Sequence, residues 1–388
     1  MRSRKGVIFV SFVSILAGSC AAGRYGPSAS SRMKPAPRTL KKLTVAERDA
    51  ILVRAQVWSP VATQSLDLLV GPQGPGAFKP QSETTCRFVY PSSPLTGLTP
   101  KFRCAMTTKD EVKVKFGPHN GEVYGVVAAS RLAWALGFAS DTWYPARVSC
   151  LDCPEDPWKA SGVEWYKGWP QFVAARKFDP SAIEREFPGD DVETPDFSGW
   201  SWPELDRVDS QKGGAPRAQV DALKLLAVFL QHNDTKPVQQ RLVCPPGELV
   251  RGDHGNETCR SARLVLKDVG ATFGEGSFWR VDKVNLERWR DAPVWRDAES
   301  CIGHLPRYLN GSLEHPAIGE AGRQFLAERL SLLSDKQIRD LFTAARVEQR
   351  GDVFHPQPGV SRPPTVDDWV RVFKDKRAQI VNHHCSAG

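Results

Sequence analysis

The stretch His-Asn-Asp-Thr-Lys-Pro-Val-Gln at residues 232–239 decides the fold of this 388-residue chain. It is a polar loop that directly follows an amphipathic helix predicted over 218–230, where Leu and Phe recur on one broad face. By itself, a polar loop in this position often serves only to end the preceding helix. The loop gains functional meaning only together with the segments on either side of it.

Downstream of the loop, the sequence predicts two short apolar strands, at 241–244 and 262–266. The insertion between them has a cysteine at each end. Lys-Asp-Val-Gly follows at 267–270, and a D-x-G sequence alone is a common turn. A loop and a turn separated by one strand pair, however, are expected to bring Asp234 and Asp268 to the same region.

Upstream, three short strands and one helix are predicted, at 85–90, 101–106, 111–116 and 122–136. The third strand contains Lys113 and Lys115, which lie on the same face because strand side chains alternate. The helix opens on Glu122 and ends before Gly137, a typical stop residue. After 267–270 the chain is largely helical, with helices predicted over 319–333, 335–347 and 366–381.

In this order, the motifs resemble those of the protein-kinase-like superfamily, and its atypical branch in particular. Residues 232–239 match the catalytic-loop pattern H-x-D-x-K-P-x-N, with Gln at the last position. Residues 267–270 stand where kinases place D-F-G, and residues 114–116 where they place the lysine of V-A-I-K. The run Asp-Val-Gly-Ala-Thr-Phe-Gly at 268–274 is similar to the D-x-G-x-x-x-G of phosphoinositide 3-kinases and secretory-pathway kinases. The chain also resembles a group of uncharacterised exported bacterial proteins.

The resemblance implies an α+β, two-lobed protein-kinase-like fold. A small antiparallel-sheet N-lobe-like region would span 44–170, and a mainly helical C-lobe-like region would span 171–388. ATP and Mg²⁺ are the cofactors that the resemblance implies.

The resemblance also implies a role for each motif residue, because phosphoryl transfer needs positioning and charge neutralisation around the phosphates. Asp234 would orient the attacking hydroxyl or accept its proton, and Lys236 would steady the phosphoryl group. Gln239 and Asp268 would offer oxygen ligands to Mg²⁺. Lys115, held by Glu122, would pair with the α- and β-phosphates, and Lys113 on the same strand face is a rival for that role.

The sequence also departs from the kinase pattern. It has no G-x-G-x-x-G loop, and the connection between the first two strands offers only Gly97 among Ser92, Ser93 and Thr96. Val replaces Phe at position 269, and no A-P-E sequence follows. These departures favour the alternative of a catalytically inactive, kinase-shaped scaffold or ligand-binding lipoprotein of the cell envelope. They leave open whether the protein is an ATP-dependent phosphotransferase or a pseudokinase.

The N-terminus reads as an export signal over residues 1–19, with a basic start and an apolar run too short to span a membrane. Small residues precede Cys20, which resembles the acylated cysteine of bacterial lipoproteins; ordinary cleavage after Ala21 or Ala22 is the alternative. Residues 20–43 then form a flexible basic tether. The sequence therefore predicts an exported protein of the bacterial cell envelope, anchored to the membrane through a lipid on Cys20 or else secreted.

The net charge of +8 does not indicate nucleic-acid binding. The first 43 residues hold nine of the 52 Lys and Arg and none of the 44 acidic residues, so the remainder is close to neutral. A protein that binds nucleic-acid phosphates carries its positive charge on the folded surface. The expected partners are a nucleotide and an unknown phosphate acceptor or envelope protein.

The cysteines agree with export, because an even number in an oxidising compartment indicates disulfides. Eight remain after Cys20, and near neighbours in the sequence predict three pairs, which leaves a fourth by elimination. The pairs are Cys86 with Cys104, Cys150 with Cys153, Cys244 with Cys259, and Cys301 with Cys385. A zinc site that joins Cys150 and Cys153 to His383, His384 and Cys385 is the alternative.

The six tryptophans between 143 and 202 are interpreted mainly as packing residues of the core. A sugar- or peptide-binding platform is the alternative for this segment. It supports a third, weaker hypothesis, a metal- or glycan-binding protein of the cell envelope.

Overall fold

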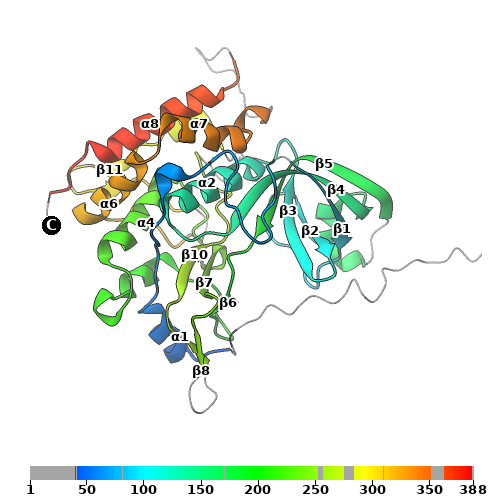
Figure 1. Cartoon of the computed structure of the whole chain (residues 1–388), viewed down its shortest axis with the longest axis horizontal. Helices are drawn as coiled ribbons and strands as arrows, with labels where there is room; N and C mark the ends of the chain where they lie inside the picture. Colours follow the sequence, from blue (N-terminus) through cyan, green and yellow to red (C-terminus); the bar gives the residue numbers. More distant parts are fainter. Residues whose placement is uncertain are drawn as a thin grey trace, which may run out of the picture.

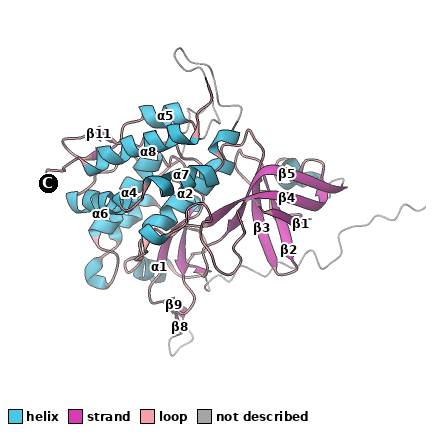
Figure 2. Ribbon diagram, turned by 45° about the horizontal axis from the view of Figure 1, so that its top comes forward, coloured by secondary structure: helices cyan, strands magenta, loops and turns pink. Residues whose placement is uncertain are grey.

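The computed structural model describes residues 40, 42–80, 82–168, 172–251, 257–274, 284–308, 310–350 and 362–386. Strands and helices are both abundant, which confirms the predicted α+β class. The longest strands gather at one side of the molecule and most helices at the other (Figure 2). No helix in the described part of the chain is long and apolar enough to cross a membrane.

Five strands close into a barrel in the order β1-β2-β3-β5-β4 (Figure 1). Neighbouring strands of the barrel run antiparallel, except β1 and β4, which pair in parallel. The strands are β1 (Glu83–Val89), β2 (Lys101–Thr107), β3 (Asp110–Phe116), β4 (Thr142–Pro154) and β5 (Phe172–Arg185). Alternate side chains point inward, so Phe88, Phe102 and Val114 are buried in one apolar cluster.

The first three strands match their predicted positions to within two residues, whereas β4 was not predicted. Strand β5, which pairs with β4, extends from Phe172 to Arg185. The predicted boundary between 170 and 171 therefore falls between two paired strands of one barrel. The division into two lobes stays a prediction.

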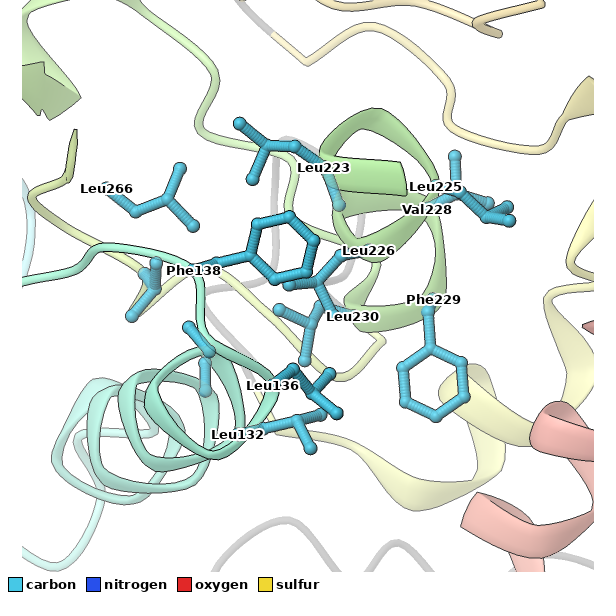
Figure 3. Close-up of a cluster of buried hydrophobic side chains, with 14 of the residues drawn as sticks. Leu132, Leu136, Phe138, Leu223, Leu225, Leu226, Val228, Phe229, Leu230 and Leu266 are labelled. Atoms are coloured by element: carbon cyan, nitrogen blue, oxygen red, sulfur yellow. The ribbon is translucent and has the colours of Figure 1, made fainter. Parts of the chain in front are cut away.

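Helices α2 (Glu122–Leu136) and α4 (Arg217–Leu230) pack against each other through a shared apolar core. In Figure 3, Leu136 and Phe138 point toward Leu226 and Leu230 of α4. Each such buried side chain contributes about 1.5–3 kcal/mol through the hydrophobic effect. This contact fixes the C-terminal end of α2 relative to the last turns of α4, which lead into residues 232–239.

A second, three-stranded sheet joins β6 (Asp190–Asp191), β7 (Gln240–Cys244) and β10 (Arg263–Leu266). The two predicted strands of this sheet, β7 and β10, are confirmed and pair antiparallel, with Gln240 opposite Leu266. The start of β7 and the end of β10 consequently lie side by side. This register brings residues 232–239 next to residues 267–270.

The remaining elements surround this framework. Helix α7 (Asp335–Ala344) begins as predicted after Ser334, whose hydroxyl accepts from the backbone N–H of Gln337. The short strands are β8 (Leu249–Arg251), β9 (Glu257–Cys259), β11 (Trp295–Asp297) and β12 (Ile302–Gly303). The other helices are α1 (Val45–Leu52), α3 (Pro157–Ser161), α5 (Leu286–Asp291), α6 (Glu320–Ser331), α7 (Asp335–Ala344) and α8 (Val366–Val381).

The eight cysteines after Cys20 form four disulfides, with Cα–Cα distances of 5.5–5.7 Å. They are the four predicted pairs: Cys86–Cys104, Cys150–Cys153, Cys244–Cys259 and Cys301–Cys385. The zinc alternative is not assembled, because Cys150 and Cys153 bond to each other in the barrel and Cys385 bonds to Cys301. Cys20 lies outside the described residues.

Candidate functional site

The site is built around the amine of Lys115, which β3 carries into the interior. The Lys115 side chain is fully buried, and its Nζ donates to Glu122 Oε2 at 2.5 Å. The same Nζ donates to both oxygens of Asp268, at 2.8 and 3.0 Å. The end of β3, the start of α2 and a turn 153 residues beyond Lys115 thus meet at one cation, and two carboxylates share it.

Electrostatics keep the Lys115–Asp268 pair ionised. Burial alone would raise the pKa of the Asp268 carboxyl, but the positive charges of Lys115 and Lys113 hold that pKa well below its usual range. Burial likewise opposes the charge on Lys115, yet Asp268 and Glu122 raise its pKa above the ordinary lysine value. A buried cation and a mostly buried anion therefore depend on each other for their charges.

Lys113 and Lys115 share a strand face, as predicted, but they have different partners. Lys113 Nζ lies 2.6 Å from Glu184 Oε1 on β5. Both amines also lie over the indole of Trp143, at 5.2 and 5.0 Å from its centroid. Of the two rivals, Lys115 is the one that contacts both Glu122 and Asp268.

Local hydrogen bonds fix the position of Glu122 at the first residue of α2. The Asn120 side chain accepts from the backbone N–H of Glu122 and donates to the carbonyls of Pro100 and Phe116. The hydroxyl of Thr99 donates to Glu122 Oε2 at 2.8 Å. The Glu122 carboxylate is therefore held by the barrel as well as by its helix.

Two glycines allow α2 to approach the turn at Asp268. A Cβ on Gly270 would lie 2.8 Å from Cγ of Glu122. A Cβ on Gly125 would lie 2.8 Å from the carbonyl oxygen of Gly270. Larger residues at either position would separate the helix from the turn, and with it Glu122 from Asp268.

The loop at 232–239 carries its own network of polar contacts. Lys236 Nζ lies 2.9 Å from Asp234 Oδ1, and Gln239 Nε2 donates to Asp234 Oδ2 at 2.8 Å. The side chains of Asp234 and Lys236 are 20% and 31% exposed, so solvent and ligands can reach them. All three predicted residues of this loop are thus brought together.

Backbone hydrogen bonds join this loop to the turn at Asp268. The carbonyl of Gln239 accepts from the N–H groups of Lys267 and Asp268, at 3.0 and 3.1 Å. The N–H of Asn233 donates to the carbonyl of Ala271 at 3.1 Å. The side chain of Asp268 accepts from the N–H of Gly270, which closes the turn. Gln239 therefore links the two aspartates, through its side chain to Asp234 and its backbone to Asp268.

His232 and three of the tryptophans occupy buried, structural positions. His232 is 1% exposed and its ring lies against Trp202, with centroids 6.3 Å apart. Trp143, Trp200 and Trp202 are fully buried. The interpretation of the tryptophan-rich stretch as core packing is confirmed for these three.

Thr99, Trp143 and Lys101 also belong to the site, although no sequence motif identifies them. Lys101 opens β2 and lies directly opposite Lys115 in the strand register. Strand alternation could have revealed Lys101 only if the pairing of β2 with β3 had been known. Thr99 and Trp143 carry no local signal, because only the folded chain places them beside Glu122 and Lys115.

The donor set suits a hard divalent cation such as Mg²⁺, which prefers carboxylate and amide oxygens. Asp268 is held ionised, its side chain is 16% exposed, and it adjoins the amide-bearing Gln239. Lys115 and Lys101 add amines that can pair with phosphate groups. Chemically, the arrangement could bind a phosphate ligand together with a cation.

Comparisons with known proteins give little further information. No protein-family model matches the chain, and no curated protein matches it. Among solved structures, the chain is similar to a Helicobacter pylori proinflammatory kinase, CtkA, with a TM-score of 0.38 and 8% identity. That match covers 79% of this chain and 95% of the other. Similarity at this level carries no argument about function.

Proposed function

We propose that this is an exported kinase-like protein that binds a magnesium nucleotide and transfers its terminal phosphoryl group to an acceptor. The barrel with α2 would be the smaller lobe, and the helices with the β6-β7-β10 sheet the larger. The observation that carries the proposal is the contact of Lys115 with both Glu122 and Asp268. These are the residues that the kinase resemblance selects as phosphate-pairing amine, its anchor and metal ligand.

Each residue would act through a contact described above. Lys115, oriented by Glu122, would pair with nucleotide phosphates, and Asp268 and Gln239 would hold Mg²⁺. The metal would neutralise charge on the phosphates. Asp234 would accept the proton of the attacking hydroxyl, and Lys236, 2.9 Å from Asp234, would stabilise the transferring group.

Binding is tested by unfolding the mature protein with and without MgATP. A ligand at 100 times its dissociation constant stabilises a protein by about 2.7 kcal/mol. We expect MgATP to stabilise the parent but not Asp268→Asn. Asp221→Asn, which alters a buried carboxylate paired with Arg217 on α4, is the matched control and should respond like the parent. Equal responses of the parent and Asp268→Asn would contradict the proposal.

Transfer is tested separately from binding, with γ-labelled ATP and a panel of hydroxyl-bearing acceptors. Asp234→Asn should keep its response to MgATP but lose transfer, because Asp234 would contact the acceptor rather than the nucleotide. Undiminished transfer by Asp234→Asn would show that Asp234 takes no part in the reaction.

The second candidate function is a kinase-shaped scaffold without turnover. One observation favours it: the charged groups already satisfy one another, since both oxygens of Asp268 accept from Lys115 and Asp234 contacts Lys236 and Gln239. Absence of any MgATP response in the parent would select this candidate.

Export and lipid anchoring are part of the same proposal. The leader at residues 1–19 supports them, and so do four disulfides, which persist in oxidising compartments. Mass spectrometry of the mature N-terminus should find an acylated Cys20. An unmodified N-terminus that begins after Ala21 or Ala22 would show that the protein is secreted without a lipid anchor.

A further inference from the structure

A short segment after α7, residues 346–350, contacts the surroundings of all three residues Lys115, Glu122 and Asp268. Helix α7 lies beside α2 in both overall views, and the segment continues from the C-terminal end of α7 (Figures 1 and 2). The segment belongs to none of the sequence motifs of the candidate site. Any effect that it has on the site must therefore pass through its contacts.

Arg346 ties the segment to the barrel, next to Lys115. Its guanidinium donates to the carbonyl of Ser181 on β5 at 2.6 Å and to Asp179 Oδ1 at 3.2 Å. Ser181 is paired with Phe116 on β3, the residue that follows Lys115. Arg346 therefore holds the end of the strand that carries the Lys115 amine.

Tyr124 ties the segment to α2, two residues after Glu122. The Tyr124 side chain is buried, and its hydroxyl donates to the carbonyls of Pro118 and Gln349, at 2.9 and 3.3 Å. Pro118 lies in the connection between β3 and α2. One hydroxyl thus joins the start of α2, the connection before it and the 346–350 segment.

Arg350 ties the segment to the chain that follows Asp268. Its Nη1 donates to the carbonyl of Val284 at 2.8 Å, and the N–H of Val284 donates to the carbonyl of Thr272. Val284 has a φ of +61°, which a β-branched residue adopts only where surrounding contacts hold it. A Cβ on Gly125 would lie 3.0 Å from a methyl group of Val284, so this residue also packs against α2.

The burial of Arg346 is costly in relation to the partners that it finds. Its side chain is 4% exposed, whereas its one carboxylate partner, Asp179, is 52% exposed. Its buried Nε has no hydrogen-bond partner among the residues that the structure describes. Partners of this kind offset only part of the cost of removing a cation from water, so stability alone gives little reason for an arginine here.

We propose that residues 346–350 form a clamp that aligns Lys115, Glu122 and Asp268, with Arg346 as its main positioning residue. The Lys115 amine holds both carboxylates at 2.5–3.0 Å, and a relative shift of about 1 Å would take most of these contacts beyond hydrogen-bond distance. Release of the clamp would let α2 move away from β3 and would separate Glu122 from Lys115. The inference rests on the proposed function, because it concerns regulation of the same site.

The first test measures calorimetric binding of MgATP to the mature protein, together with phosphoryl transfer from γ-labelled ATP. Arg346→Met should weaken MgATP binding about tenfold or more, because charged hydrogen bonds that align the site are lost, and transfer should fall with it. Arg346→Lys keeps the charge and should recover part of the affinity.

Arg323→Met is the matched control. The Arg323 side chain is 7% exposed and, like Arg346, donates to a backbone carbonyl and a carboxylate, those of Ile380 and Glu320. Its contacts join α6 to the end of α8 and do not involve the site. Arg323→Met should lose stability but bind MgATP like the parent.

Hydrogen exchange reads the alignment without any ligand. Amides in the first turns of α2 should exchange faster in Arg346→Met than in the parent and should keep their protection in Arg323→Met. A purely structural role would instead accelerate exchange in α2 equally in both variants, through global unfolding. If Arg346→Met does not fold, Arg350→Met decides, because it leaves the barrel contact in place; the same changes are expected, with a smaller loss.

The outcomes separate the clamp from the proposed function. If Arg346→Met and Arg350→Met bind MgATP like the parent while Asp268→Asn does not, the clamp is wrong and the function stands. If α2 loses protection in Arg346→Met but the parent does not bind MgATP, the clamp stands and the nucleotide function is wrong. Equal loss of α2 protection in Arg346→Met and Arg323→Met overturns the clamp.

Discussion

Lys115 on β3 and Asp268 after β10 form an ion pair in which one amine donates to both carboxylate oxygens, across 153 residues of sequence. The pair ties the barrel to the sheet that adjoins α4. Because Glu122 shares the same amine, the pair also fixes the start of α2. Stability and ligand binding should therefore depend on the same three residues.

Lys115→Met should strongly destabilise the protein, because it leaves two carboxylates close together without their cation. Removing one partner of a buried ion pair costs about 3–5 kcal/mol. Urea unfolding measures the loss. Lys177→Met, which removes an exposed barrel lysine paired with Glu83, should change stability little. The double variant Lys115→Met/Asp268→Asn should be more stable than the sum of the single losses predicts, and strict additivity would rule out the coupling.

Lys101 should make stability depend on pH in the alkaline range. Its pKa is lowered to about 8 by burial and by Lys115 and Lys113, against the opposing charges of Glu122 and Asp268. Between pH 8 and about 10.4, the ordinary lysine pKa, the unfolded chain thus binds more protons at Lys101 than the folded chain does. The contribution of Lys101 to stability rises with pH in that window. Relative to Lys101→Met, the parent should gain free energy of unfolding between pH 8 and 10; a constant difference would show that Lys101 is not perturbed.

Peptide mapping of the non-reduced, exported protein should recover four disulfides, in the pairs that the structure contains. Replacing Cys244 and Cys259 by Ser should lower stability by about 3 kcal/mol, the value for a loop of this length. MgATP binding should survive, because that disulfide closes the excursion between β7 and β10 rather than the site. Loss of binding in a variant that remains folded would mean that the excursion belongs to the site.

Local patterns predicted the elements that position the site, and tertiary contacts decided the rest. The apolar stripe of α2 and its end at Gly137 were evident from the sequence. In the structure Gly137 adopts a φ of +87°, the left-handed conformation that favours glycine at a helix end. Strand β4 was missed because it contains Pro145, and prolines argue against a strand. Alternation placed Lys113 and Lys115 on one face, but only the positions of Glu184 and Asp268 separate their roles. Lys101 was missed because its importance depends on the register between β2 and β3.

The most direct test of the central claim is calorimetric titration of MgATP into the mature protein, into Lys115→Met and into Lys113→Met. The account predicts one bound nucleotide per chain in the parent, retained by Lys113→Met and weakened at least about tenfold by Lys115→Met, because only Lys115 meets Asp268. Equal affinity for the parent and Lys115→Met, or no binding to the parent, would contradict it.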